Sequence, residues 1–402
     1  MPSAPGRGRP ASAALSGVAV AGLVAVLACV AAAAPHAAGV AADTTHVMLG
    51  ADISALAAPL SPGQYFPPYQ EHGKTSDELT ILERHGWNAY RLRVFVSPTR
   101  EAPDNSLENT IPLAKRIKAS GATFLLDIHY SDTWADPQHQ ETPVAWRGLS
   151  FDSLEQQVET YSRNTIAAFK QAGAMPDWVQ VGNEITNGML WPQGRVYHEP
   201  HGQDIQSGGP PPAGIPADYD SVTQWDHLTR LIKAGIKGVN EGAGDTPPRI
   251  VIHIDRGGDW TVTKWFFDHL QVANVPYDII GESFYPPWEH GSLADLWQTM
   301  QGAAQRYGKD FLVAETGYTQ SHATDNPDMM WPVTPQGRLQ FMADLINTVD
   351  RAPRGIGVMY WAPEWDGWNA DGSPAPMVFV LDSLNSLRTS PYSHIPPVAG
   401  GG

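Results

Sequence analysis

The stretch Trp178-Val-Gln-Val-Gly-Asn-Glu-Ile-Thr-Asn-Gly-Met-Leu-Trp191 predicts a buried strand that carries an acid to its carboxyl end. Its acid, Glu184, directly follows an amide, Asn183. A second stretch, Phe311-Leu-Val-Ala-Glu-Thr-Gly-Tyr318, places Glu315 behind another apolar run. Two glutamates, each at the carboxyl end of a buried strand, are what hydrolysis of a glycosidic bond by two carboxyl groups requires.

Around these stretches, predicted strands and helices alternate along the whole chain. Such alternation indicates parallel strands, and eight of them predict an α/β fold, the (β/α)8 TIM barrel, with enlarged loops after the strands. One catalytic domain is expected over residues 46–390, followed by a Pro/Gly-rich tail at 391–402. A doubly wound open sheet is the rival, but no glycine-rich turn follows the first strand. The predicted strands are 47–53, 89–95, 123–129, 178–182, 249–254, 277–285, 311–318 and 356–361, and the predicted helices are 75–85, 107–119, 151–172, 222–239, 262–270, 293–306, 334–349 and 381–387.

Polar and aromatic residues gather at the carboxyl ends of the predicted strands, which form the catalytic face of such a barrel. Arg91 and Arg93 share one face of a buried strand and need acidic partners there. Either they neutralise interior carboxylates for structure alone, or at least one holds a catalytic glutamate ionised. The residues at these ends are Asp52, Arg91, Arg93, His129, Asn183, Glu184, Glu282, Tyr285, Glu315 and Trp361.

The composition narrows the class of ligand. The chain of 402 residues has a formal charge of −16 at neutral pH. A protein this acidic repels polyanions, which argues against nucleic acid and strongly anionic polysaccharides and favours a neutral substrate. Of the 14 tryptophans, some are expected in the core and others in a cleft where sugars stack.

The N-terminal residues 1–41 predict a secretion signal, with Arg7 and Arg9 ahead of a long run of small apolar residues. Cleavage near residues 39–41 would leave a secreted protein without a membrane span. It would also remove Cys29, the only cysteine, and with it any disulfide. In the alternative, Val26-Leu-Ala-Cys29 is a lipobox and the mature protein is anchored by a lipid at Cys29.

Seven motifs, spread over the whole predicted domain, resemble the endo-β-1,4-galactanases of glycoside hydrolase family 53. The combination of HYSDTWADP with GNEITNGMLWP is highly specific, whereas Asn-Glu alone is weak. One departure is Phe95-Val-Ser97, where the family often has Trp-Asn. The motifs are GADIS at 50–54, YRLRV at 90–94, LLDIHYSDTWADP at 125–137, VQVGNEITNGMLWP at 179–192, DIIGESFYPPW at 278–288, VAETGY at 313–318 and GVMYWAPEW at 357–365.

The resemblance implies a retaining β-1,4-galactanase that acts on the (arabino)galactan side chains of pectin. Glu184 would be the acid/base with a raised pKa, and Glu315 the nucleophile with a depressed one. Asn183 would bind the sugar 2-hydroxyl, and Tyr285 with Arg91 or Arg93 would orient the nucleophile. Further substrate contacts are expected from Asp52, His129, Asp132, Trp134, Asp136, Trp191, Trp288 and Trp361.

Two features have two readings each, and two histidines are considered as metal ligands. Glu282 is either a third acid of the site or points outward to the helices, and we favour the outward orientation because Tyr285 lies three residues away. Residues 255–259 (DRGGD) are either a structural calcium loop, as in some bacterial relatives, or a solvated loop, which we favour. His129 and His253 lack further histidines at metal spacing, so neither a zinc site nor a required cofactor is expected.

Other functions fit parts of the same pattern. A related endo-glycanase acting on mannan, cellulose or xylan would use the same two carboxyls. A secreted carbohydrate-binding protein that has lost catalysis is disfavoured because both glutamates are present. A metal-dependent hydrolase would want His-x-His at the first strand, where Ala51-Asp-Ile-Ser54 stands instead. No feature indicates an oligomer, so a monomer is expected.

Overall fold

The computed structural model describes residues 47–57, 69–71, 74–76, 78–98, 105–196, 220–286, 291–318 and 330–363. These all belong to the compact unit Thr45–Gly402. The predicted signal with Cys29, the helix at 381–387, the tail at 391–402 and Trp288 lie outside the described residues.

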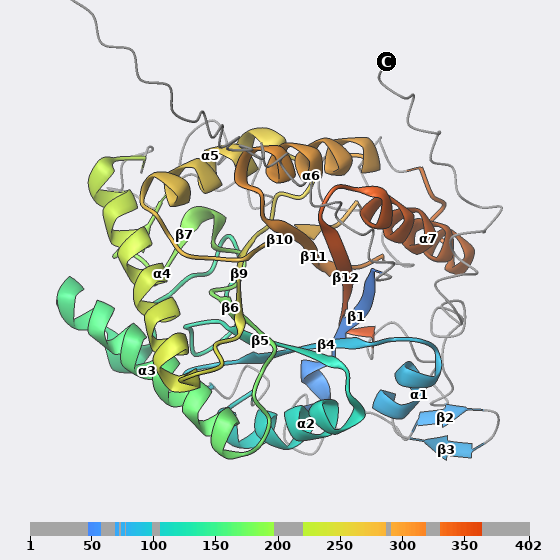
Figure 1. The fold of residues 1–402 in the computed structure, drawn as a ribbon, viewed down its shortest axis with the longest axis horizontal. Helices are drawn as coiled ribbons and strands as arrows, with labels where there is room; N and C mark the ends of the chain where they lie inside the picture. The colour runs from blue at the N-terminus through green and yellow to red at the C-terminus, as the bar shows by residue number, and fades with distance from the viewer. Residues whose placement is uncertain are drawn as a thin grey trace, which may run out of the picture. The chain divides into compact units, whose positions relative to one another are not determined.

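Eight parallel strands form a closed barrel, which confirms the predicted fold (Figure 1). The ring closes because β1 pairs with β4 on one side and with β12, the last strand, on the other. The order around the ring is β1-β12-β11-β10-β9-β6-β5-β4. The strands are β1 (Met48–Asp52), β4 (Ala89–Val94), β5 (Thr123–Ile128), β6 (Trp178–Val181), β9 (Arg249–Ile254), β10 (Ile279–Phe284), β11 (Asp310–Thr316) and β12 (Gly355–Trp361).

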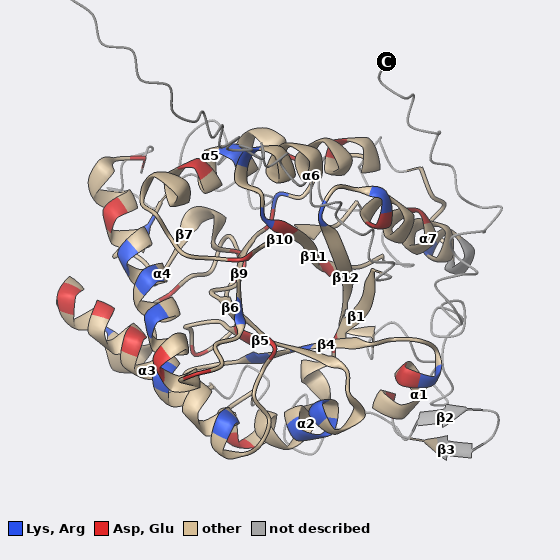
Figure 2. Ribbon diagram, in the orientation of Figure 1, with Lys and Arg blue, Asp and Glu red and all other residues tan. Residues whose placement is uncertain are grey.

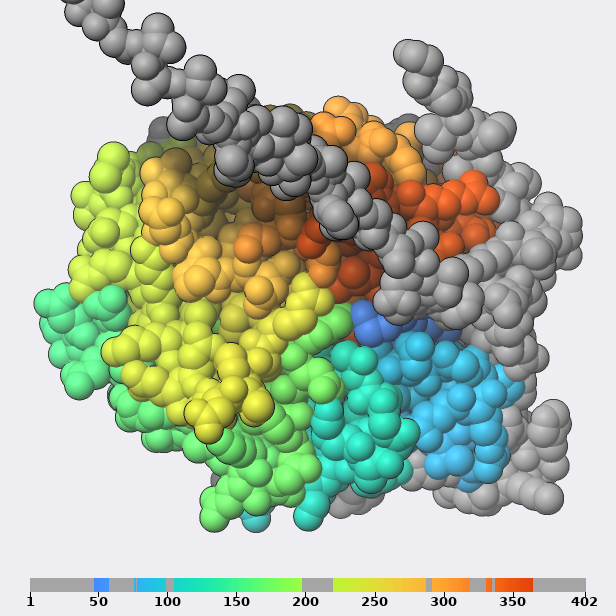
Figure 3. Space-filling view, viewed as in Figure 1, coloured from blue at the N-terminus to red at the C-terminus, as the bar shows by residue number. Residues whose placement is uncertain are grey.

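The strands are buried on both faces, which explains why their sequences are nearly continuous apolar runs. Inside the ring, each of seven strands contributes to one apolar cluster, and Figure 3 shows atoms filling the centre that the ribbon leaves open. The barrel is therefore a packed core rather than a pore. The cluster contains Ala89, Leu125, Trp178, Val251, Ile279, Leu312, Ala314 and Met359.

Helices surround the barrel and begin at sequence signals that favour helix starts. Ser221 and Ser292 form capping boxes with Gln224 and Asp295. The predicted cap Thr334 accepts a hydrogen bond from the Gly337 amide, and Pro335 occupies the first turn. The helices are α1 (Glu78–Arg84), α2 (Leu107–Ser120), α3 (Phe151–Gln171), α4 (Val222–Ala243), α5 (Trp260–Val272), α6 (Leu293–Tyr307) and α7 (Pro335–Arg351).

Short elements lie between the barrel strands and the helices. Two of them are antiparallel strand pairs that were not predicted. The helix expected from residue 75 begins at Glu78, because β3 (Lys74–Ser76) pairs with β2 (Tyr69–Glu71) in a short antiparallel hairpin. A second antiparallel pair, β7 (Gly188–Met189) and β8 (Gly194–Arg195), lies in the long loop after β6, where no strand was predicted. Short 3-10 helices occupy Ser54–Ala57, Val144–Trp146 and Ile185–Asn187.

Both signs of charge occur on the outer helices α3 and α4 (Figure 2), and oppositely charged residues pair between them. Arg230 contacts Glu155 at 2.5 Å, and Lys237 contacts Glu159 at 2.9 Å, each joining α4 to α3. Within the described part of the chain, no helix combines the length and apolarity needed to cross a membrane.

Candidate active site

The carboxyl ends of the strands meet at one rim, where the backbone turns sharply. Three residues other than glycine adopt left-handed φ angles just after strands of the barrel: Tyr130 at 52°, Glu184 at 46° and Ala362 at 49°. This conformation is unfavourable for residues with a Cβ and tends to occur at functional sites. At the rim, the structure brings together most of the predicted site residues.

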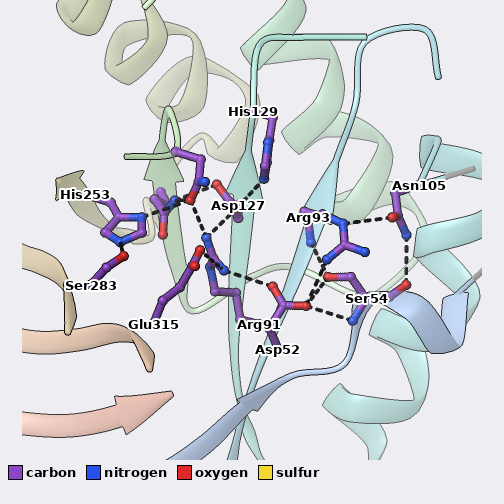
Figure 4. A network of polar contacts seen from close by, with 12 residues as sticks. Asp52, Ser54, Arg91, Arg93, Asn105, Asp127, His129, His253, Ser283 and Glu315 are labelled. Carbon is purple, nitrogen blue, oxygen red and sulfur yellow. Dashed lines mark hydrogen bonds and ion pairs between the residues drawn. The ribbon is translucent and has the colours of Figure 1, made fainter. Parts of the chain in front are cut away.

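Arg91, on β4, is the centre of the polar network at this rim (Figure 4). Its Nη1 lies 2.9 Å from Asp52 Oδ2 and 2.7 Å from Glu315 Oε1. Its Nη2 lies 2.7 Å from Asp127 Oδ2 and donates to Asn183 Oδ1 at 2.6 Å. Burial alone would lower the pKa of Arg91, but Asp127, Glu315 and Asp52 outweigh burial and raise it. Of the two candidate arginines, Arg91 is therefore the one that contacts the carboxylate at the end of β11.

Arg93 has a different role. Its Nε donates to Asn105 Oδ1 at 3.0 Å, and its Nη1 lies 3.4 Å from Asp52 Oδ1. Its guanidinium lies 4.1 Å above the ring centre of Trp134, an arrangement that favours a cation–π contact. Arg93 thus joins Asp52 to an aromatic residue of the rim rather than to either glutamate.

Asp127, on β5, is a site residue that the sequence analysis missed. Its carboxylate contacts Arg91, His129 Nε2 at 2.9 Å and Gln180 Nε2 at 2.6 Å, and it is fully buried. Burial would raise the pKa of Asp127, but Arg91 and His129 hold it below the ordinary value. The signal was present in the sequence: an acid inside the apolar run 123–128 has to find a cationic partner.

Replacing Asp127 by Asn is expected to lower the free energy of unfolding by about 3 kcal/mol, because a buried ion pair then loses one partner. The new amide would also face donors from Arg91 and Gln180. Urea denaturation of both proteins measures the difference. The matched control is Asp152→Asn, because Asp152 forms an exposed ion pair with Arg230. Its free energy of unfolding is expected to fall by less than about 0.5 kcal/mol. An Asp127→Asn protein as stable as its parent would contradict the counter-charge role.

Glu315, on β11, is held from two sides. Arg91 contacts its Oε1, and the Tyr285 hydroxyl donates to its Oε2 at 3.0 Å. Burial, reinforced by Glu315, raises the pKa of Tyr285 well above its usual value, so this hydroxyl remains a donor. The predicted depression of the Glu315 pKa is wrong: burial raises it, Arg91 opposes the rise, and Asp52 and Asp127 add to it.

Glu184, directly after β6, has a different environment. Its Oε1 lies 2.5 Å from Ser283 Oγ on β10. Burial raises the pKa of Glu184 well above its usual range, and the charges of Glu315, Asp255 and Asp136 raise it further. Glu315 has an arginine partner and Glu184 faces further acids, so a proton shared by the pair is held at Glu184.

Asn183 is fixed by its neighbours. Its Nδ2 donates to the Ala135 carbonyl at 2.7 Å, and its Oδ1 accepts from Arg91 and from Gln180 Nε2 at 3.0 Å. Gln140 Nε2 donates to the Asn183 carbonyl at 2.7 Å. The amide therefore has one defined orientation beside Glu184.

Several aromatic residues of the rim contact one another or a nearby arginine. The rings of Trp134 and Trp361 are 6.1 Å apart. Phe95, at the position where the sequence departs from the family, packs edge-on against His129 and Trp134. Trp191 is partly exposed, donates to the Asn187 carbonyl, and lies under Arg195.

The two aspartates of the loop after β5 organise that loop. Asp132 accepts from the amides of Ser97 at 3.0 Å and Val144 at 2.8 Å. Asp136 accepts from the amides of Gln138 and His139. His129 accepts from the Ala135 amide at 3.0 Å while its other nitrogen contacts Asp127.

Glu282 has the outward orientation that the sequence analysis favoured. It accepts hydrogen bonds from the Thr263 hydroxyl on α5 and from the Arg256 amide. In residues 255–259, Asp259 caps α5 by accepting from the amides of Thr261 and Val262, and Asp255 accepts from the Thr186 hydroxyl. Among the residues that the structure describes, no group of three or more His, Cys, Asp or Glu is arranged to hold a metal ion.

Comparison with known proteins agrees with this geometry. The model of the family described as "Glycosyl hydrolase family 53" matches residues 48–376. A probable arabinogalactan endo-β-1,4-galactanase A of Aspergillus fumigatus is 32% identical over 363 residues, 87% of this chain and 93% of that protein. An uncharacterised protein of Niallia circulans is 38% identical over 73% of this chain and 78% of its own.

Solved structures give the same result. A fungal β-1,4-galactanase superposes with a TM-score of 0.70 at 27% identity, covering 83% of this chain and 98% of that one. The glycoside hydrolase family 53 catalytic domain of Ignisphaera aggregans gives 0.69 at 28% identity, covering 84% and 96%. Because the family match extends over most of the sequence and includes both glutamate-bearing strands, this chain belongs to glycosyl hydrolase family 53.

Proposed function

We propose that this glycoside hydrolase is a retaining endo-β-1,4-galactanase, with Glu315 as nucleophile and Glu184 as acid/base. The observation that carries the assignment is the unequal environment of the two carboxyls. Glu315 contacts Arg91 and Tyr285, which favour the ionised form. Glu184 is largely shielded from solvent and faces further acids, which favour the protonated form. One ionised and one protonated carboxyl is the starting state of a retaining glycosidase.

In the first step, a Glu315 oxygen forms a bond to the anomeric carbon while the bond from that carbon to the leaving oxygen breaks. Glu184 gives its proton to that oxygen, so the departing chain leaves as a neutral alcohol. Arg91 and Tyr285 hold Glu315 in a fixed position and keep its charge available. Asn183 lies beside Glu184, where an amide hydrogen can bind the sugar 2-hydroxyl as positive charge develops on the ring.

In the second step, Glu184 is ionised and takes a proton from water. The hydroxide so formed bonds to the anomeric carbon, and the bond to Glu315 breaks. Both carboxyls return to their starting protonation states. Two inversions at one carbon leave the β configuration unchanged.

The substrate assignment rests on the named relatives, the acidic chain and the aromatic rim. Relatives that share most of this chain are called arabinogalactan endo-β-1,4-galactanases. A neutral galactan, such as the side chains of pectin, avoids the repulsion that the charge of −16 would exert on an anionic polymer. The aromatic residues Trp134, Trp191 and Trp361 offer surfaces on which sugar rings can stack. We propose secretion from the N-terminal signal in residues 1–41, with lipid anchoring at Cys29 as the alternative.

Purified protein is expected to release reducing ends from unsubstituted β-1,4-galactan at least about 100-fold faster than from mannan or carboxymethyl-cellulose, because a well-placed polar contact discriminates strongly between hydroxyl configurations. Proton NMR taken early in the reaction should show the β-anomer of the new reducing end. Activity on mannan without activity on galactan would overturn the substrate. An α-anomer as first product would overturn the retaining mechanism.

A further inference from the structure

A chain of buried hydrogen bonds leads away from Glu184 into the barrel. Ser283 Oγ, on β10, lies 2.5 Å from Glu184 Oε1 and 3.0 Å from His253 Nε2 on β9. His253 Nδ1 lies 2.9 Å from Asn183 Oδ1. Ser283 and His253 are fully buried. Four residues on three strands or strand ends thus form a closed polar path from the acid back to its sequence neighbour, Asn183.

The orientation of the Asn183 amide fixes the tautomer of His253. The Asn183 nitrogen faces a carbonyl, that of Ala135, and its oxygen faces a guanidinium, that of Arg91. Neither neighbour permits the amide to be reversed, because a carbonyl only accepts and a guanidinium only donates. His253 Nδ1 faces this amide oxygen, which can only accept a hydrogen bond, so Nδ1 has to carry a proton and donate it.

The second nitrogen of His253 is then unprotonated. Burial, together with the positive charge of Arg91, lowers the pKa of His253 well below its usual value, although Asp127 opposes this shift. A neutral ring with a proton on Nδ1 offers a lone pair at Nε2. Because Ser283 is the group that faces Nε2, its hydroxyl proton is directed at the histidine.

We propose that Ser283 and His253 are positioning residues that hold Glu184 as a proton donor, because the serine hydroxyl is directed to the histidine and presents only lone pairs to the acid. This inference rests on the proposed acid/base role of Glu184. A hydroxyl has one proton to donate, so Ser283 cannot donate to both neighbours. A hydrogen bond donated by Ser283 to Glu184 would lower the pKa of the acid. With the serine proton directed to His253, the short contact is made by the acid's own proton instead, and the pair stabilises the protonated form.

Several charged groups act on the same acid. Glu315 on β11, Asp255 after β9 and Asp136 after β5 face Glu184 and favour its protonated form, and Tyr285 lies nearby. Around His253, Arg91 on β4 and His129 after β5 disfavour a second proton, and Asp127 favours one. The serine–histidine pair adds a directional hydrogen bond to these through-space effects.

The arrangement serves both steps of the reaction. When Glu184 has given its proton to the leaving oxygen, the carboxylate faces lone pairs of Ser283 unless the hydroxyl turns away from His253. Either choice costs about one hydrogen bond, so Glu184 regains a proton readily from water in the second step. The pair needs no other reactant, because every proton moves between Glu184, the leaving oxygen and water.

The test is the pH dependence of kcat/KM on β-1,4-galactan, whose basic limb reports loss of the Glu184 proton. Ser283→Ala removes the acceptor of that proton, so the basic limb is expected to move to lower pH by about 0.5–1 pH unit. His253→Phe leaves Ser283 free to donate to Glu184 and should move the limb in the same direction. Ser283→Thr keeps a hydroxyl and should restore the parental profile. Ser162→Ala, which removes a buried hydroxyl on α3 that contacts Tyr130, should leave the profile unchanged.

A basic limb that moves to higher pH in Ser283→Ala would overturn the proposal, since it would show Ser283 donating to the carboxylate. An unchanged limb would overturn it as well. Azide added to Glu184→Ala acting on an activated aryl galactoside separates this outcome from failure of the proposed function. If azide rescues that variant while Ser283→Ala shows no downward shift, only the serine–histidine proposal fails. If Glu184→Ala keeps parental activity, the acid/base assignment itself fails.

Discussion

Glu315→Ala is expected to lower kcat on β-1,4-galactan by about 10⁴-fold or more, since removal of a covalent nucleophile leaves only binding and the acid to act. Arg91 and Tyr285 would then face an empty position rather than a carboxylate. Binding of a galactan oligosaccharide, measured by calorimetry, should stay within about tenfold of the parent, because the aromatic and amide contacts remain. Reducing-sugar release over long incubation measures the loss of turnover.

Two controls accompany the Glu315 variant. Glu315→Gln keeps the shape of the side chain and should be as inactive, which separates chemistry from packing. Azide with an aryl galactoside that carries an activated leaving group should give the α-galactosyl azide, because azide enters from the face that Glu315 has vacated. Turnover of galactan at more than about one-hundredth of the parental rate would rule out Glu315 as nucleophile.

Glu184→Ala is expected to lower kcat on galactan by about 10²–10⁴-fold, the contribution of a general acid in the right position. An aryl galactoside whose phenol leaves without protonation should react with nearly the parental rate in the first step and stall as a covalent intermediate. A burst of phenol followed by a slow phase, seen by stopped-flow absorbance, is the expected record. The contrast between the two substrates identifies an acid rather than a structural residue.

Azide gives the second readout for Glu184. It should accelerate the slow phase and yield the β-galactosyl azide, because azide attacks the intermediate from the side where Glu184 stood. Glu282→Gln is a matched control, since Glu282 is a buried glutamate at a strand end that contacts α5 and lies outside the network. An equal loss on galactan and on the activated substrate would refute the acid/base assignment.

The barrel and the two glutamates could be predicted because each depends on local sequence. Apolar runs that alternate with helical segments indicate parallel strands, and a polar residue at the end of such a run reaches the rim. This reasoning identified Glu184, Glu315, Arg91 and Tyr285. The orientation of Glu282 followed from the two-residue period of a strand, counted from Tyr285.

The inner contacts of the site could not be predicted, because they depend on which strands are neighbours and on their register. Ser283 follows a register shift between β10 and β11 that places it opposite Glu315, and no local signal announces such a shift. His253 contacts Asn183, 70 residues away in the sequence, only because β9 pairs with β6. The pKa of Glu315 was predicted in the wrong direction because its burial, and the closeness of Asp52 and Asp127, are properties of the folded rim.

The hairpin of β2 and β3 also could not be predicted from local sequence. Residues 75–85 have helical spacing, yet the chain is a strand up to Ser76, because pairing with Tyr69–Glu71 satisfies its backbone. A three-residue strand is too short for alternation of apolar and polar residues to show. Tertiary pairing therefore decided where α1 begins.

The pairing of the first strand with the last has a consequence for synthesis on the ribosome. Until β12 has emerged, β1 and β11 each have an open edge, and such edges invite pairing with other chains. Until β11 has emerged, Arg91 lacks Glu315, one of its three acidic partners. A chain that lacks β12 cannot close the ring, so we expect nascent chains that stop before residue 355 to associate with chaperones, whereas chains that include β12 close the ring and no longer need them.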